Sequence, residues 1–325
     1  MSVVLRAHKL AKTFRIGFWR KKVVALRDAT FDVNEHEVFG LIGPNGAGKT
    51  TTLKILTGLV KPDAGEGSLL GQPIGSVDAR RHLGYLPEAP YFYEYLTVGE
   101  LLHFYGGIFG MSRAERQKRI DELIEKVGLS HARDRPLRKF SKGMLQRAGL
   151  AQALIHDPQL VILDEPQTGL DPIGRTQVTR LIMELREQGK SVFFASHILP
   201  DVERVCDRVA VMFNGKVVGV GRLSELLKAQ VLDVEILAEG LGAESRPEFE
   251  QLGCSWRDVD GEGGRVMLVA EDVKVGREAM SLVLQRGGAV RGYNERHEHL
   301  EDLFVRQANS EQEGAAATSG ASGGA

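Results

Sequence analysis

The sequence contains few cysteines and no long apolar run. Its two cysteines, Cys206 and Cys254, are far apart, and neither belongs to a C-x-x-C pair. This excludes a disulfide framework and a cysteine-rich zinc site, so we expect reduced thiols that are buried or incidental. No apolar run approaches the roughly 20 residues that a membrane-spanning helix needs. The first residues, MSVVLRAHKLAKTF, lack the apolar stretch of a secretion signal, and we therefore expect a cytosolic protein.

The sequence also has almost no net charge. Lys and Arg together number 42 and Asp and Glu number 43, which gives a formal net charge of −1. A near-neutral chain argues against nucleic acid as the main partner. The 325 residues suggest about two domains, and the apolar content of 42% is ordinary for a globular protein.

A glycine-rich segment of the form G-x-x-x-x-G-K-[ST] occupies residues 43–50 and reads GPNGAGKT. Glycines allow backbone angles that turn successive N–H groups toward phosphate oxygens. Lys49 is placed to reach the β and γ oxygens of a nucleoside triphosphate, and the Thr50 hydroxyl suits Mg²⁺. The predicted nucleotide-binding residues here are Gly43, Pro44, Asn45, Gly46, Ala47, Gly48, Lys49, Thr50 and Thr51.

The flanking residues support this interpretation over an ordinary glycine-rich turn. Val38–Ile42 reads as a buried strand, and residues 51–59 read as a helix whose N-terminus faces the anion. Residues 160–163 and 192–195 are two further buried-strand candidates. They end in the polar pairs Asp164-Glu165 and Ser196-His197. Ligands of open α/β sheets bind beyond the carboxyl ends of strands, so these pairs can converge on the phosphate loop.

The pattern of elements predicts an α/β domain over residues 1–222, with a helical region before Asp164. Ser112 and Glu115 form a capping-box pattern, and Asn214-Gly215 predicts a two-residue hairpin turn. Residues 223–308 predict a small α+β domain with the order strand, helix, strand, strand, helix, strand, which fits a split βαβ unit. Residues 309–325 are rich in Gly, Ala and Ser, and we expect them to be disordered.

Taken together, the motifs at residues 43–50, 84–90, 140–147, 161–166, 169–172 and 196–197 resemble those of the ATP-binding-cassette (ABC) ATPases. The resemblance covers roughly residues 3–222. It implies a phosphate-loop NTPase cassette, with a RecA-like α/β core, an antiparallel β subdomain and a helical subdomain. It also implies ATP and Mg²⁺ as the bound nucleotide and ion.

The resemblance implies a role for each motif. In VILDEP, Asp164 would hold Mg²⁺ and Glu165 would polarise the attacking water; an acidic helix cap is the alternative. His197 matches the switch histidine. FSKGMLQR resembles the signature LSGGQ, with Ser141 and Gly143 matching and Lys142 and Met144 departing from it. Such a segment binds the γ-phosphate on the opposite subunit, although an ordinary Ser-capped helix fits the same letters. The loop at residues 169–172, with Asp171, resembles the contact between subunits.

Two positions leave alternatives open. Glu88 stands where the family has a glutamine; a carboxylate can still bind Mg²⁺ and serve in catalysis, but the substitution puts metal geometry and coupling in doubt. Phe14 matches the aromatic that stacks on adenine, and Phe18 and Trp19 are rivals. The basic residues 15–22 could form a solvated hairpin tip, which we favour, or contact lipid headgroups. The aromatics after Glu88 could line a groove for a membrane subunit or belong to the core: Tyr91, Phe92, Tyr93 and Tyr95.

These expectations combine into one function. The chain would hydrolyse ATP as one of two nucleotide-binding subunits, in a homodimer or heterodimer that sandwiches two ATP and drives separate transmembrane permease subunits. It would lie in the cytoplasm, peripheral to the inner face of the membrane. The C-terminal segment at residues 297–305 resembles that of subunits paired with ABC-2-type exporter permeases, which favours export. The alternative is a non-transport ABC ATPase acting on ribosomes or DNA, whose relatives usually carry two cassettes.

Overall fold

The computed structural model describes residues 2–18, 20–226, 231–259 and 264–297. Contacts divide the chain between Leu223 and Ser224 into two compact units, called here the large unit and the small unit. The predicted tail at residues 309–325 lies outside the described residues. So does the segment at residues 297–305, apart from the backbone of His297.

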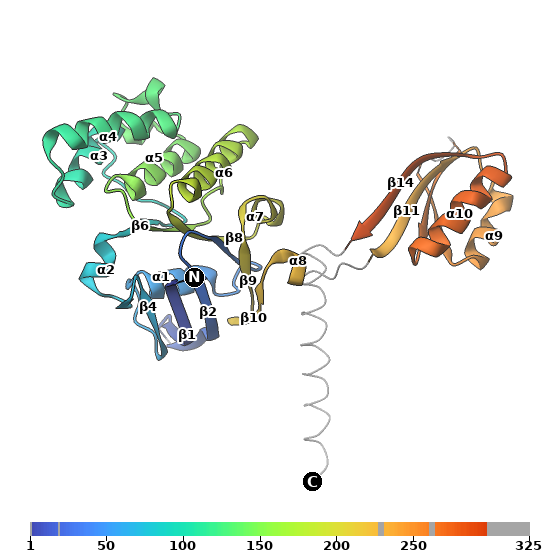
Figure 1. Cartoon of the computed structure of the whole chain (residues 1–325), viewed down its shortest axis with the longest axis horizontal. Helices are drawn as coiled ribbons and strands as arrows, with labels where there is room; N and C mark the ends of the chain where they lie inside the picture. Colours follow the sequence, from blue (N-terminus) through green and yellow to red (C-terminus); the bar gives the residue numbers. More distant parts are fainter. Residues whose placement is uncertain (1, 19, 227–230, 260–263, 298–325) are drawn as a thin grey trace, which may run out of the picture. The chain divides into compact units, whose positions relative to one another are not determined.

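The large unit is built on one mixed sheet (Figure 1). Strands β6, β7, β8, β3 and β9 run parallel, β5, β4, β1 and β2 run antiparallel, and β10 joins the two parts. The strands are β1 (Val3–Ile16), β2 (Lys21–Asn34), β3 (Val38–Ile42), β4 (Ala64–Leu69), β5 (Gln72–Pro73), β6 (Leu83–Leu86), β7 (Leu160–Asp164), β8 (Ser191–Ser196), β9 (Arg208–Phe213) and β10 (Lys216–Gly221).

The helices of the large unit fall into two groups. Helices α3, α4, α5 and α6 lie together at one end of the unit, whereas α1 packs against the sheet (Figure 1). The helices are α1 (Lys49–Leu56), α2 (Val77–Arg81), α3 (Val98–Ile108), α4 (Arg113–Lys126), α5 (Lys142–Leu154), α6 (Pro172–Glu187) and α7 (Leu199–Val205), with the short α8 (Leu223–Leu226) at the division between the units.

Several local predictions are confirmed. The strand at Val38–Ile42 has the predicted bounds, and β7 and β8 extend the predicted strands by one or two residues. Ser112 and Glu115 form both hydrogen bonds of a capping box. Asn214 and Gly215 both have positive φ between β9 and β10, as a two-residue hairpin turn requires. Helix α1 begins two residues earlier than predicted and ends at Leu56, before Gly58 with φ 76°.

The core of the large unit includes apolar side chains of β2 that pack against those of the parallel strands β3 and β8. All residues of β3, β7 and β8 are buried, so both faces of these strands are covered. The rings of Phe31, Phe39 and Phe193 pack against one another with centroids 5.6 to 5.9 Å apart. This rigid centre fixes the ends of the strands from which the site is built.

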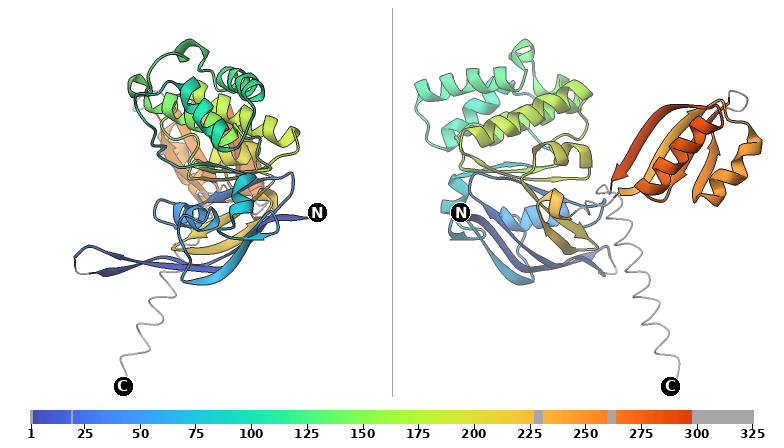
Figure 2. Two further views of the ribbon diagram at one scale, coloured as in Figure 1. Left: turned by 90° about the vertical axis from the view of Figure 1, so that its left-hand side faces the viewer. Right: turned by 45° about the vertical axis from the view of Figure 1, so that its right-hand side comes forward.

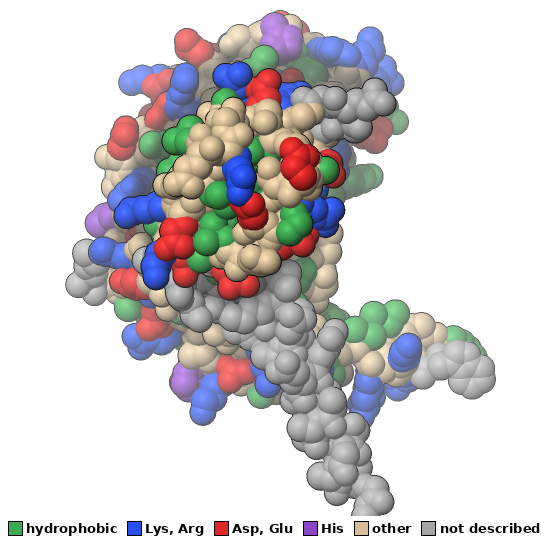
Figure 3. All heavy atoms as spheres, turned by 90° about the vertical axis from the view of Figure 1, so that its right-hand side faces the viewer, with side chains coloured by type: hydrophobic (Ala, Val, Ile, Leu, Met, Phe, Trp, Pro, Cys, Tyr) green, Lys and Arg blue, Asp and Glu red, His purple; other side chains and the backbone are tan. Residues whose placement is uncertain are grey.

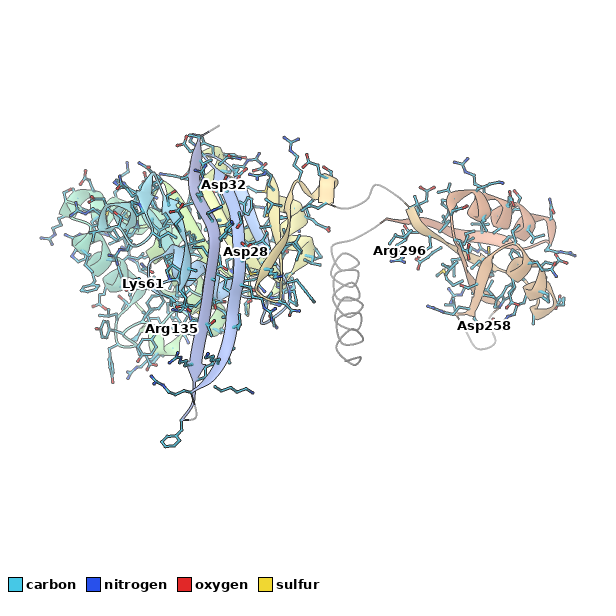
Figure 4. The ribbon with its side chains drawn as sticks, turned by 90° about the horizontal axis from the view of Figure 1, so that it is seen from below. Asp28, Asp32, Lys61, Arg135, Asp258 and Arg296 are labelled. Atoms are coloured by element: carbon cyan, nitrogen blue, oxygen red, sulfur yellow. The ribbon has the colours of Figure 1, made fainter. Side chains whose placement is uncertain are left out.

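The small unit has the predicted order of elements. These are β11 (Val231–Glu239), α9 (Arg246–Gln251), β12 (Cys254–Asp258), β13 (Arg265–Ala270), α10 (Val273–Gln285) and β14 (Ala289–His297). The four strands form an antiparallel sheet in the order β12-β13-β11-β14, a split βαβ arrangement. Its core includes Phe249 and residues of alternate positions on β11 and β13. Arg296 on β14 pairs with Asp233, and Asp258 accepts a hydrogen bond from Trp256 (Figure 4).

One half-buried histidine connects α3 to the sheet. The His156 ring stacks on Phe109, which ends α3, with centroids 3.7 Å apart and an angle of 5° between the planes. Its Nε2 lies 3.2 Å from the Leu83 carbonyl oxygen, and its Nδ1 is buried without a partner among the described residues. Burial lowers the pKa of His156 from 6.5 to about 4.

We predict that this histidine makes the protein less stable in mild acid. Between about pH 6.5 and about pH 4, the unfolded chain binds a proton at His156 that the folded chain does not bind, so stability falls as the pH falls through this range. In His156→Phe the ring stack is kept and this proton is lost. The drop in unfolding free energy from pH 7 to pH 5, measured by urea denaturation, should shrink by about 1 kcal/mol, roughly half of what the full pKa difference would give, because solvent screens the exposed part of the ring. An unchanged drop, equal to that of the exposed control His103→Phe, would contradict this.

Candidate active site

The site forms where three parallel strands end. Strand β8 pairs with β3 through Ile42↔Ser196 and with β7 through Asp164↔Ala195. Their carboxyl ends therefore lie at one edge of the sheet, followed by the phosphate loop, by Glu165 and by His197. The predicted convergence of these segments is present in the structure.

The phosphate loop depends on glycine at distinct positions. Gly46 and Gly48 have φ of 83° and 108°, in the region that favours glycine. A Cβ at Gly48 would lie 2.6 Å from the Ala25 carbonyl oxygen, and one at Gly43 would lie 2.3 Å from that of Met212. Substitution would thus push the loop away from β2 and β9. The loop leads into α1, whose first N–H groups face the space above it.

Lys49 is buried in this loop, and its ammonium group has hydrogen-bond and ion-pair partners within the chain. Its Nζ donates hydrogen bonds to the carbonyl oxygens of Gly43 (2.7 Å) and Pro44 (3.3 Å). It also lies 3.4 Å from Glu165 Oε1, and both side chains are buried. The ammonium group is therefore held at the mouth of the loop, where it can bind phosphate oxygens.

Asp164 is the buried carboxylate of the site. Its Oδ1 accepts a hydrogen bond of 3.3 Å from the Thr50 hydroxyl, and its Oδ2 has no partner among the described residues. Burial, with the nearby carboxylates of Glu88 and Glu165, raises its pKa to about 6. An unpartnered buried carboxylate oxygen beside a threonine hydroxyl fits a divalent cation, which would stabilise the charged form.

Mg²⁺ is the ion that this donor set suits best. It prefers oxygen ligands and is usually bound by one or two carboxylates together with substrate phosphates. Among the described residues there is no cluster of three or more His, Cys, Asp and Glu side chains that could hold a metal ion without such help.

Glu165 is oriented by its backbone and by two neighbours. Its φ is 49°, a left-handed value, and its N–H donates to the Ala195 carbonyl oxygen. Oε2 lies 2.8 Å from His197 Nδ1, while Oε1 faces Lys49. His197 is 42% exposed, so its other ring nitrogen can reach a ligand. The pair forms a carboxylate held by an imidazole next to a phosphate site, a suitable arrangement for accepting a proton from water.

A cavity of about 590 Å³ lies over the phosphate loop. Its lining includes predicted residues of the loop together with Glu88, Glu165 and His197. It also includes Val23, Val24, Ala25 and Thr168, which were not predicted from the sequence. The lining residues are Val23, Val24, Ala25, Asn45, Gly46, Ala47, Gly48, Lys49, Thr50, Thr51, Glu88, Glu165, Thr168 and His197.

The proposed adenine-stacking residue lies beside the cavity rather than in its wall. Phe14 pairs across the hairpin with Val23, which lines the cavity, but Phe14 itself does not. The Lys12 ammonium group lies 5.7 Å from the centre of its ring. Of the two rival aromatics, Phe18 is exposed at the hairpin tip, and Trp19 is outside the described residues.

The segments predicted to act on a second subunit do not line the cavity. Ser141 caps α5 by accepting a hydrogen bond from the Met144 N–H, and Asp171 caps α6 in the same way through Gly174. Within one chain the segments of Ser141 and Asp171 touch each other, since the Lys142 side chain lies against Gly169. A Cβ added at Gly169 would lie only 2.8 Å from Lys142 Cδ. Ser141 and Asp171 are exposed and Gly143 is partly exposed, and none of the three lines the cavity over the phosphate loop.

The aromatic residues after Glu88 differ in burial, which bears on whether they belong to the core or line a groove. Phe92 is buried, whereas Tyr91, Tyr93 and Tyr95 are exposed. Tyr91 and Phe92 line a groove of about 290 Å³ whose other walls include residues of β6, α3 and α5 together with His156. No helix among the described residues is both long and apolar enough to cross a membrane.

Comparison with known proteins identifies the family. Residues 26–168 match the family described as ABC transporter. The uncharacterised ABC transporter ATP-binding protein sll0415 of Synechocystis is 50% identical over 227 residues, covering 69% of this chain and 64% of that protein. The Nod factor export ATP-binding protein I of Burkholderia lata is 33% identical, covering 87% and 92%. The bacitracin transport ATP-binding protein BcrA of Bacillus licheniformis is 39% identical, covering 66% and 69%.

Solved structures agree with this assignment. The ATP-binding subunit of an ABC transporter matches with a TM-score of 0.62 and 34% identity, covering 69% of this chain and 91% of that one. The dimeric cassette MJ0796 bound to ADP and Pi has the same TM-score at 26% identity, covering 67% and 98%. The chain belongs to the ATP-binding proteins of ABC transporters, a family that binds ATP. The predicted cassette fold is confirmed, and the relatives include ATP-binding proteins of exporters.

We predict that Lys49→Ala weakens ATP binding at least about tenfold, because charge-assisted hydrogen bonds to phosphate contribute roughly 1.5–3 kcal/mol. Calorimetric titration with ATP and Mg²⁺ measures the change. The exposed lysine of α4, changed in Lys118→Ala, serves as the control and should leave affinity as in the wild type. Equal affinities for all three proteins would contradict the role of Lys49.

Proposed function

We propose that this chain is the ATP-hydrolysing subunit of an ABC exporter, that it dimerises around two ATP molecules, and that it drives separate membrane permease subunits of the ABC-2 type. Residues 1–222 would carry the ATPase and residues 223–308 would form an accessory domain. The observation that carries this proposal is the meeting of Lys49, Asp164, Glu165 and His197 at one sheet edge, with one buried Asp164 oxygen left without a partner.

The chemistry that we assign to these residues is hydrolysis of the γ-phosphate. Lys49 would bind the β and γ oxygens in place of the Gly43 and Pro44 carbonyls, and Thr50 and Asp164 would hold Mg²⁺, with Glu88 at the open side. The bound ion would neutralise charge on the phosphoryl oxygens. Glu165 Oε2 would accept a proton from the attacking water, with His197 fixing its orientation.

The second half of each site would come from a partner subunit. Ser141 and Gly143 lie at the N-terminus of α5, whose N–H groups and dipole favour an anion. The neighbouring Asp171 segment packs against this helix start, so both would meet the partner as one surface. Phe14 would stack on adenine from its place beside Val23.

A membrane partner fits the remaining features. The groove beside Tyr91 and Phe92 lies on the same loop as Glu88, which borders the ATP cavity, so occupancy of one can influence the other. The Nod factor export and bacitracin transport relatives favour export. A non-transport ABC ATPase acting on ribosomes or DNA is the alternative. Copurification of a multi-span membrane protein with the full chain would favour the first and oppose the second.

We predict that Glu165→Gln retains ATP binding and lowers the rate of hydrolysis at least about a hundredfold, since general-base catalysis contributes roughly 10²–10⁴-fold. Phosphate release and ATP binding are measured on the same preparation. Glu187→Gln, at an exposed position near the end of α6, is the matched control. Near-normal turnover in Glu165→Gln would show that another group activates the water.

We predict that Ser141→Arg, placed in the Glu165→Gln background, prevents ATP-dependent dimerisation while single chains still bind ATP. A long side chain at the start of α5 would block approach of the partner's γ-phosphate. Light scattering with and without ATP gives the mass. Ser112→Arg removes the equivalent cap from α4 and controls for loss of the cap alone. ATP-dependent dimers of the Ser141 variant would contradict the composite site.

A further inference from the structure

The hairpin between β1 and β2 extends beyond the sheet. Strand β1 pairs with β4 only as far as Ala11↔Ala64, and β2 meets β10 only at Asp28. Beyond these contacts the pairs from Thr13↔Val24 to Ile16↔Lys21 join no further strand in the described part of the sheet. Figure 2 shows this ribbon projecting from the large unit, and Figure 4 shows it beyond Asp28 and Asp32 of β2. We call residues 13–18 and 20–24 the ribbon.

The ribbon is anchored firmly at its base only. Asp63 accepts hydrogen bonds from the Thr13 N–H and from Lys12 Nζ, both at 2.8 Å. At the tip, the Arg20 N–H donates to the Gly17 carbonyl oxygen, and both residues have positive φ. A two-stranded ribbon is only marginally stable in water. A projecting ribbon of this length gains stability from a surface that covers it.

Large apolar side chains are exposed along the ribbon. Phe18 is 94% exposed and Ile16 57%. Ile16 stands opposite Lys21, so an exposed apolar side chain and a cation share one face of the ribbon. Figure 3 shows apolar side chains and Lys and Arg side chains together on the projecting part. Such exposure is unfavourable in water unless an apolar phase receives these groups.

The same segment carries charge of one sign. Residues 15–24 contain four cations and no acidic residue: Arg15, Arg20, Lys21 and Lys22. Arg15 stands directly opposite Lys22 across the ribbon, and like charges in this position destabilise a strand pair. No ion pair joins these four cations to a carboxylate in the described parts of the chain. An external anion would remove the repulsion.

We propose that the ribbon binds the anionic surface of a lipid bilayer, with its cations at the phosphate headgroups and Ile16 and Phe18 at the boundary with the acyl chains. A soluble polyanion would satisfy the cations but would leave the apolar side chains in water, whereas a bilayer surface receives both. From the sequence we favoured a solvated hairpin tip over contact with lipid headgroups. The opposed cations Arg15 and Lys22 and the exposed side chains of Ile16 and Phe18 lead us to propose lipid binding instead. The side chains assigned to this binding site, the four cations with Ile16 and Phe18, do not line the ATP cavity.

The test uses the full chain and sucrose-loaded vesicles without nucleotide. Wild type should sediment with vesicles of phosphatidylcholine and phosphatidylglycerol (roughly 70:30) and remain in solution with phosphatidylcholine alone. The variant Arg20→Glu/Lys21→Glu/Lys22→Glu should lower the partition coefficient at least about tenfold, because each cation near an anionic surface contributes roughly fivefold. Binding should weaken as salt rises. None of the three residues lines the ATP cavity, so ATP affinity checks folding.

Matched variants separate the possible outcomes. Arg113→Glu/Lys118→Glu/Arg135→Glu makes the same charge change at exposed positions of the helical end and should bind vesicles like wild type. Ile16→Ser/Phe18→Ser keeps the charge and should also reduce binding. Absence of wild-type binding, or equal losses in the two charge variants, would overturn the proposal. Two results together would also overturn the proposal: full vesicle binding by Ile16→Ser/Phe18→Ser, and competition by a DNA oligonucleotide that equals competition by the anionic vesicles. They would show that the ribbon is a general polyanion site.

Discussion

The alignment of β3, β8 and β7 is the constraint on which the site depends. Their backbone hydrogen bonds set Ile42 beside Ser196 and Asp164 beside Ala195, so three loops from distant parts of the sequence begin at the same level. The strands are buried on both faces, and the aromatic cluster around Phe39 keeps them from sliding. A slip of one residue in any strand would turn its last side chains to the opposite face.

The charged side chains of the site are held in place by contacts within the chain itself. Burying Lys49 beside Glu165 is costly for each charge alone, and the carbonyls of the phosphate loop and the His197 ring offset part of that cost. Asp164 is the exception, because one of its oxygens is left without a partner and its pKa is raised. A cation bound there would supply the missing partner of this oxygen and stabilise the charged form of the carboxylate.

The sequence predicted best those features that depend on neighbouring residues. The Ser112 cap, the Asn214-Gly215 turn and the buried strands follow from local chemistry, and the phosphate loop follows from glycine and lysine spacing. It could not predict Val23 and Val24 as cavity walls, because this depends on how the β1–β2 hairpin lies over the loop. It also could not predict the packing of Lys142 on Gly169, which joins segments that are distant along the chain.

The left-handed backbone of Glu165 has a consequence for how this site can vary. A non-glycine residue at φ 49° is strained by roughly 1 kcal/mol or more, and a β-branched residue is more strained still. Glycine would relieve the strain but would remove the carboxylate. With the catalytic role that we propose for Glu165, selection for thermal stability and selection for turnover therefore act in opposite directions at this one position. A more heat-resistant form of the protein must find its added stability elsewhere in the chain.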